Sequence, residues 1–224
     1  MTKSAVVLAS GGMDSTACLW WAKRRGYRLF ALSVDYGQRH RRELASARRV
    51  AGLAGARHFE VRLDLPWLET SSLVNAARPL PDVPLGRIGR GGIPSTYVPG
   101  RNTVLLSLGV SLADAVGAEA VVTGANALDY SGYPDCRPSF HRAFERVARE
   151  GTRRGAEGRA LRIEAPLLRL DKAGVVRLAR RLGAPLAETW SCYRGGRRPC
   201  GACDSCKLRA KGFAGAGIPD PAAR

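Results

Sequence analysis

Apolar residues recur along this chain in two ways, as short runs typical of buried strands and as longer stretches with helical spacing. The first run, Ser4 to Ala9, reads SAVVLA and is followed directly by a stretch of helical spacing. Strand and helix patterns then alternate along most of the chain. The predicted strands are residues 4–9, 28–34, 57–62, 120–124 and 161–164, and the predicted helices are 16–25, 41–53, 103–116, 139–152 and 172–182.

This alternation predicts an α/β fold with a doubly wound, Rossmann-like parallel sheet. Ser139 is a candidate N-cap for its helix, and Gly183 is expected to end the last one. Two segments lack either pattern: residues 64–101 are rich in Pro, Gly and Ser, and residues 125–138 are polar. Long irregular segments in compact domains usually carry function, so both are expected to be functional loops.

A length of 224 residues suits one domain with a full core, and there is no internal repeat or long linker. The expected organisation is a nucleotide-binding catalytic domain over residues 1–190 and a zinc-binding segment over 191–213 packed on it. Residues 214–224 are expected to form a frayed tail.

The turn after the first strand carries the first chemical motif, SGGMDS at residues 10–15. Two glycines let the backbone approach a ligand closely, and the following helix offers free N–H groups to a pyrophosphate. Asp14 would repel a phosphate, so its expected role is to hold the loop or to place Mg²⁺. The alternative is a plain glycine-rich turn. The candidate nucleotide-binding residues are Leu8, Ala9, Ser10, Gly11, Gly12, Met13, Asp14, Ser15 and Thr16.

Four cysteines near the end form the second motif, Cys192-x7-Cys200-x2-Cys203-x2-Cys206. Four thiolates at short spacing predict one tetrahedral Zn²⁺, and because no coordination position stays open the metal is expected to be structural. An iron–sulfur cluster is the alternative, although ferredoxin-like spacing places its fourth cysteine after the triplet, before a proline.

The charge changes this picture little. Lys and Arg number 36 against 19 acidic residues, a net charge of +17, but 31 of the 36 are arginine and they are spread along the chain. Such a bias fits the coding composition of a genome, so we expect no stable nucleic-acid partner. No apolar run approaches the ~20 residues that span a bilayer, and the first residues show no leader pattern. A cytoplasmic protein without a membrane partner is expected.

The two irregular segments supply candidates for binding a flat, anionic substrate. Carboxylates there suit the two donors of a guanine-like edge, tyrosines suit stacking, and arginines suit a carboxylate or phosphates. Each of these residue types is also common in turns or as a solvated side chain. The candidates are Asp129 and Asp135 for the edge, Tyr130 and Tyr133 for stacking, and Arg101 and Arg137 for anions.

With these motifs in place, the chain resembles a known family. SGGMDS resembles the pyrophosphate loop of the ATP-dependent group that contains GMP synthetase, asparagine synthetase and the tRNA-thiolating enzymes. Further segments resemble the 7-cyano-7-deazaguanine synthases: residues 35–40 (DYGQRH), 97–102 (YVPGRN), 124–126 (GAN), 129–137 (DYSGYPDCR), 189–193 (TWSCY) and the zinc segment 200–206 (CGACDSC). The resemblance runs from about Val6 to Phe213 and is weakest between Asp64 and Gly89.

The resemblance implies an adenine nucleotide hydrolase-like fold and a cytoplasmic homodimer. It implies ATP-dependent conversion of 7-carboxy-7-deazaguanine and ammonia to the 7-nitrile in queuosine or deazapurine biosynthesis, through an activated carboxylate and an amide, with Mg²⁺ and structural Zn²⁺. No glutaminase segment is recognisable, so free ammonia is the expected nitrogen source. The implied catalytic residues are Asp14, Ser15 and Arg101, and the implied substrate-binding residues are Tyr97, Asn102, Asp129, Tyr130, Tyr133, Asp135 and Arg137.

Two other functions stay open from the sequence. A tRNA sulfur-transfer enzyme on the same scaffold would want a reactive cysteine beside the nucleotide, and Cys136 is the loop candidate. The second alternative is a nucleic-acid-binding protein that a zinc ion stabilises. It would bind RNA in a salt-dependent way and would not turn over ATP.

Overall fold

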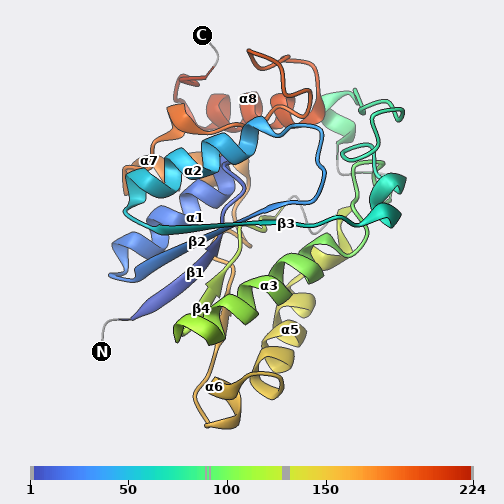
Figure 1. Cartoon of the computed structure of the whole chain (residues 1–224). Coiled ribbons are helices and arrows are strands. Elements are labelled where there is room, and N and C mark those ends of the chain that lie inside the picture. Colours follow the sequence, from blue (N-terminus) through green and yellow to red (C-terminus); the bar gives the residue numbers. More distant parts are fainter. Residues whose placement is uncertain (1–2, 89, 91, 128–131, 223–224) are drawn as a thin grey trace.

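The fold is a five-stranded parallel sheet with helices on both faces (Figure 1). The structure is a computed structural model that describes residues 3–88, 90, 92–127 and 132–222. The strands lie in the order β3-β2-β1-β4-β5 and every pairing is parallel. The doubly wound α/β prediction is therefore confirmed. The strands are β1 (Ser4–Leu8), β2 (Arg28–Asp35), β3 (Arg57–Arg62), β4 (Ala120–Val122) and β5 (Arg162–Glu164).

Each face of the sheet has its own apolar core, because successive side chains of a strand point to opposite faces. Val7 and Val122 belong to one core, and their neighbours Val6 and Val121 belong to the other. In Figure 1, α1 (Met13–Arg24), α2 (Arg42–Ala54), α7 (Lys172–Leu182) and α8 (Asp204–Ala216) lie on one side of the sheet. On the other side lie α3 (Arg101–Val116) and α5 (Pro138–Glu150), followed by the short α6 (Arg153–Ala156).

The chain order reverses between β1 and β4, which are neighbours in the sheet. In open parallel sheets a ligand crevice lies outside the carboxyl ends of the strands at this reversal. The turn after β1 and the residues after β4 meet there. They lie so close that a Cβ on Gly124 would be 3.3 Å from the Ser15 amide nitrogen. The fold thus places SGGMDS at the expected ligand position.

The segment between β3 and α3 is irregular, as predicted. It contains only the 3₁₀ turns η1 (Pro66–Thr70) and η2 (Leu85–Arg87) among its described residues. It is nevertheless anchored, because Leu68, Leu73 and Val98 are buried in the core on the α3 side. Two further 3₁₀ turns, η3 (Pro134–Cys136) and η4 (Leu186–Glu188), lie in later loops.

Two local predictions need correction, one is confirmed, and one helix was not predicted. Gly183 does end α7, with a positive φ of 75°. Ser139 is not an N-cap, because α5 already begins at Pro138, a residue suited to the first helical position. Helix α8 had no sequence signal of its own. The tail is not frayed over 214–220, because buried Arg209 pairs with Asp220 at 2.7 and 2.9 Å and holds it down.

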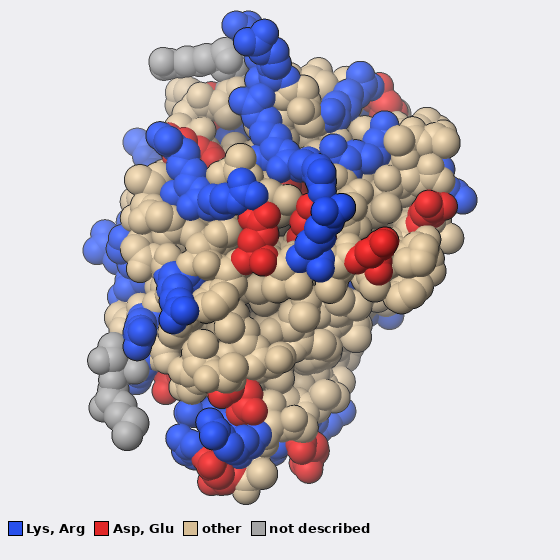
Figure 2. Space-filling model, viewed as in Figure 1, with Lys and Arg blue, Asp and Glu red and all other residues tan. Residues whose placement is uncertain are grey.

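Figure 2 shows Lys and Arg side chains over several parts of one face, with acidic side chains among them. The densest run crosses the upper half of the view, where α2 and α8 lie. None of the helices in the described part of the chain is long and apolar enough to cross a bilayer.

Candidate functional site

A cavity of about 510 Å³ opens at the carboxyl ends of β1 and β4. Its wall combines the SGGMDS loop, the residues after β4, the start of α3 and the segment around the four cysteines. Among the predicted nucleotide-binding residues, Gly11 and Thr16 lie outside the lining. The others all line the cavity: Leu8, Ala9, Ser10, Gly12, Met13, Asp14 and Ser15.

The SGGMDS loop, called the pyrophosphate loop below, holds its own shape through short hydrogen bonds. The Ser10 and Ser15 hydroxyl oxygens lie 3.1 Å apart, and the Gly12 amide donates to Ser10 Oγ at 3.3 Å. Ser15 Oγ also donates to the Gly12 carbonyl at 3.1 Å. Helix α1 starts directly at Met13, so the unpaired N–H groups of its first turn belong to the loop itself. A phosphate at this point would meet donors that need no rearrangement.

Gly11 ties this loop to two other elements. Its φ is +76°, and a Cβ at this position would lie 2.2 Å from the Glu43 carbonyl of α2. The Gly11 carbonyl accepts a hydrogen bond from the Trp190 amide at 2.9 Å and one from Ser46 Oγ at 3.0 Å. The loop is therefore fastened both to α2 and to the chain that leads into the cysteine cluster.

Gly11→Ala is expected to lower the free energy of unfolding by roughly 2–4 kcal/mol, because strain at positive φ and a backbone clash add together. Gly26→Ala is the matched control, since Gly26 has the same φ of +76° but nothing within 4 Å of its Cβ position. Urea unfolding of both variants measures the difference. Equal losses would show that the close approach of α2 does not constrain the loop.

Asp14 connects the loop to the start of α7 and to the residues that follow β4. Its Oδ2 accepts hydrogen bonds from Lys172 Nζ at 2.5 Å and from Asn126 Nδ2 at 3.2 Å. Its Oδ1 is buried and has no hydrogen-bond partner in the described structure. A buried carboxylate oxygen without a partner is costly, and a cation at the cavity wall would satisfy it. The residues present thus fit both predicted roles of Asp14, holding the loop and placing Mg²⁺.

Arg101 begins α3 and lines the same cavity. Burial acts to lower the pKa of its guanidinium, but the Tyr36 side chain and, more weakly, Tyr133 outweigh burial and raise it. The group therefore stays charged. No carboxylate lies within salt-bridge distance of it in the described residues, and its Nε has no partner there. A half-buried cation without an anion is an incomplete ion pair, which a substrate carboxylate would complete.

The other predicted substrate residues divide into three groups. Asn102 and Tyr133 line the cavity with Arg101. Tyr97, Asp135 and Arg137 do not: the Tyr97 hydroxyl accepts from the Gly100 amide, and Asp135 Oδ2 accepts from the Asn102 amide at 3.0 Å. Arg137 is exposed at the start of α5. Asp129 and Tyr130 lie outside the described residues.

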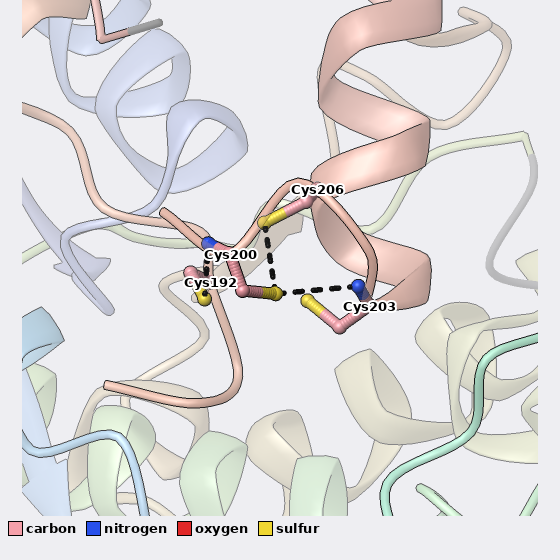
Figure 3. A group of neighbouring side chains, drawn as sticks. All are labelled: Cys192, Cys200, Cys203 and Cys206. Carbon is pink, nitrogen blue, oxygen red and sulfur yellow. Dashed lines mark hydrogen bonds between the residues drawn. The ribbon is translucent and has the colours of Figure 1, made fainter. Parts of the chain in front are cut away.

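The four cysteines converge as predicted (Figure 3). Their sulfur atoms all lie within 4.8 Å of one another, and Cys200 Sγ is 3.9 Å from Cys206 Sγ. Sulfurs about 2.3 Å from a tetrahedral Zn²⁺ lie roughly 3.8 Å apart, so the donors fit one zinc ion. Hydrogen bonding from the Cys206 thiol lowers the pKa of Cys203, which favours the thiolate that a metal ligand needs. Three of the four are buried, which suits a structural metal.

Comparison with known proteins agrees with this geometry. A model of the family described as "Queuosine biosynthesis protein QueC" matches residues 4–217. The 7-cyano-7-deazaguanine synthase of Anaeromyxobacter sp. (strain Fw109-5) is 58% identical over 222 residues, 98% of this chain and 95% of that protein. The chain belongs to the QueC family of 7-cyano-7-deazaguanine synthases.

A second QueC-family relative, the 7-cyano-7-deazaguanine synthase of Synechococcus sp. (strain RCC307), is 48% identical over 225 residues, 100% of both chains. Among solved structures, the U34-tRNA thiolase of Methanococcus maripaludis with its [4Fe-4S] cluster is 16% identical. It has a TM-score of 0.49 and covers 94% of this chain and 63% of that one.

Sequence reasoning missed several residues that line the cavity of this QueC-family chain. The sequence pattern assigns Lys172 and Glu43 only to predicted helices, 172–182 and 41–53. Lys172 is one of five lysines and directly follows the N-cap Asp171 at the carboxyl side of the sheet, a signal that was available. Arg209 also lines the cavity. No local pattern marks it, because α8 itself was not predicted.

Proposed function

We propose that this chain is an ATP-dependent 7-cyano-7-deazaguanine synthase that acts on 7-carboxy-7-deazaguanine and ammonia. The observation that carries the proposal is the pairing of two features on one cavity. A loop of free helix N–H groups suits a triphosphate, and a half-buried guanidinium with no acidic partner among the described residues suits a carboxylate. An enzyme that activates a carboxylic acid with ATP needs both.

The chemistry follows from the poor electrophilicity of a carboxylate. A carboxylate oxygen attacks the α-phosphorus of ATP and pyrophosphate leaves, which gives an acyl-adenylate. Ammonia then adds to the acyl carbon, AMP departs and a proton is lost, which leaves the primary amide. The amide oxygen then attacks the α-phosphorus of a second ATP and pyrophosphate leaves. AMP carries that oxygen away and two N–H protons are lost, so that the nitrile forms. No step requires a covalent enzyme intermediate.

The residues of this chain have three tasks in that sequence. The first turn of α1 and Lys172 offset the charge of the departing pyrophosphate. Arg101 holds the carboxylate in line for attack, and the cavity walls limit competing water. Mg²⁺, held by Asp14, would add charge neutralisation at the phosphates. Ser15 keeps the loop in shape through its bonds to Ser10 and Gly12.

The cysteine cluster would hold a structural Zn²⁺ that secures the end of the chain against the sheet. Four thiols that a metal shares suit a reducing compartment, which supports a cytoplasmic location. We also propose a homodimer, supported by exposed apolar side chains at Trp67 and Ile93, which are 65% and 63% exposed. Sedimentation of the purified protein tests this state.

Mass spectrometry of the purified protein with ATP, Mg²⁺, ammonium and 7-carboxy-7-deazaguanine tests the reaction. We expect the nitrile to appear, and Asp14→Asn to lower its rate by roughly 10²-fold or more, because the variant loses the charge that holds Lys172 and the cation. ATP consumption without nitrile would point to another acid or to a tRNA substrate. No turnover from folded, metal-loaded protein would exclude the proposal.

A tRNA sulfur-transfer enzyme remains the second candidate for one reason. Cys136, 4% exposed, lines the cavity and its Sγ accepts a hydrogen bond from Asn102 Nδ2 at 3.1 Å. Sulfur transfer would need this thiol, whereas no step of nitrile formation uses one. Cys136→Ser is therefore expected to retain nitrile formation. Loss of all turnover in a folded Cys136→Ser protein would favour the thiol-dependent chemistry.

A further inference from the structure

We infer that Glu43 recognises the N1–H and 2-amino edge of the deazaguanine ring and so sets the specificity of the enzyme for a 2-aminopurine-like substrate. The inference rests on the proposed function. The edge offers two parallel donors, and a carboxylate accepts both with its two oxygens. The recognition of this edge therefore calls for a carboxylate that faces the cavity and has lone pairs to spare.

Three carboxylates line the cavity among the described residues, Asp14, Glu43 and Asp204. Asp14 belongs to the pyrophosphate loop and is engaged by Lys172. Asp204 Oδ1 accepts from the Val83 amide at 3.0 Å and so fastens the irregular segment to α8. Asp135, a candidate from the sequence, does not line the cavity, and its carboxylate accepts a hydrogen bond from the Asn102 backbone amide. Among the described residues, Glu43 is therefore the cavity carboxylate that is left to bind this edge of the ring.

The Glu43 carboxylate is held in a fixed orientation from two sides. Gln38 Nε2 donates to its Oε1 at 3.1 Å, and His40 Nε2 lies 2.9 Å from its Oε2. Gln38 is itself immobilised, because its Oε1 accepts from the Tyr36 amide at 2.9 Å and it is 1% exposed. Each Glu43 oxygen thus uses one lone pair and keeps another. A side chain fixed before the ligand arrives loses little entropy on binding.

The position of Glu43 relative to Arg101 fits the shape of the substrate. Glu43 lies on α2 and Arg101 on α3, and these helices cover opposite faces of the sheet (Figure 1). Tyr36 lines the cavity together with both groups, and its amide holds Gln38, which in turn holds Glu43. The 7-carboxylate and the N1/2-amino edge lie on opposite ends of the fused ring. One ring between the two helices would present its anion to Arg101 and its donors to Glu43.

Exchange of the hydrogen-bonding pattern tests the inference with a gain of activity. A glutamine at position 43 offers one acceptor and one donor, which match the N1–H and the carbonyl of the 2-oxo analogue, 7-carboxy-7-deazaxanthine. Glu43→Gln is expected to lower kcat/KM for the 2-amino substrate by about 10²-fold and to raise it for the 2-oxo analogue by about 10-fold. Because misfolding cannot create activity, this gain separates recognition from structural damage.

Matched amide variants of the other carboxylates complete the experiment: Asp129→Asn, Asp135→Asn and Asp204→Asn. Each is expected to keep the preference for the 2-amino substrate over the 2-oxo analogue. A reversed preference in any of them, or an unreversed one in Glu43→Gln, would overturn the inference. If the unaltered protein makes no nitrile from the 2-amino substrate, the proposed function fails instead, so the two failures are distinguishable.

Discussion

Arg101→Met is expected to lower kcat/KM for the carboxylate substrate by roughly 10²–10³-fold, because a desolvated charge-assisted pair contributes about 3–4 kcal/mol. The same change is expected to leave the melting temperature unchanged or to raise it. Arg101 is half-buried, with its Nε enclosed, and has no acidic partner among the described residues, so its charge costs desolvation energy that no protein anion returns. Methionine keeps most of the volume and removes that cost.

The opposite directions of activity and stability are what make this test decisive. Arg142→Met serves as the control, since Arg142 is exposed on α5 and does not line the cavity. It should leave both quantities near those of the unaltered protein. Steady-state kinetics and thermal unfolding measure the two effects. A large drop in melting temperature for Arg101→Met with little kinetic change would make the residue structural rather than substrate-binding.

Removal of the metal, or Cys203→Ser, is expected to lower the melting temperature by about 10 °C or more. Structural zinc sites contribute several kcal/mol to folding, and 1 kcal/mol corresponds to roughly 2–4 °C in a domain of this size. The cluster anchors α8 and the preceding loop, and Trp190 extends this anchoring to the Gly11 carbonyl. ATP affinity should therefore fall together with stability. That coupling is not expected of a metal that serves only a surface loop.

Metal analysis accompanies the melting experiment. One zinc per chain is expected, whereas iron with sulfide absorption would establish the iron–sulfur alternative. Cys136→Ser is the matched control, because it removes a buried thiol outside the cluster and should leave the metal content unchanged. A metal-free protein with the same melting temperature and the same ATP affinity would refute the anchoring role.

The sequence alone determined the features that depend on neighbouring residues. Short apolar runs predicted the central strands β1, β2 and β4, because a strand buried on both faces needs consecutive apolar side chains. The SGGMDS loop was also predictable from the sequence, because its glycines and the start of its helix are adjacent in the chain. The cysteine cluster spans only Cys192 to Cys206, so spacing was enough to bring four sulfurs together.

Only the tertiary structure decided which distant residues share the cavity. Lys172 meets Asp14 across 158 positions, and pairing over such a separation follows from packing and not from local pattern. Arg209 meets Asp220 in a segment that the sequence predicted to be frayed, because the fold buries the Arg209 side chain. The sequence offered Asp135 for the substrate edge, but η3 turns its carboxylate toward Asn102. Glu43 reaches the cavity because α2 packs directly on Gly11. Composition marks which groups are available, and burial and contact decide which of them face the ligand.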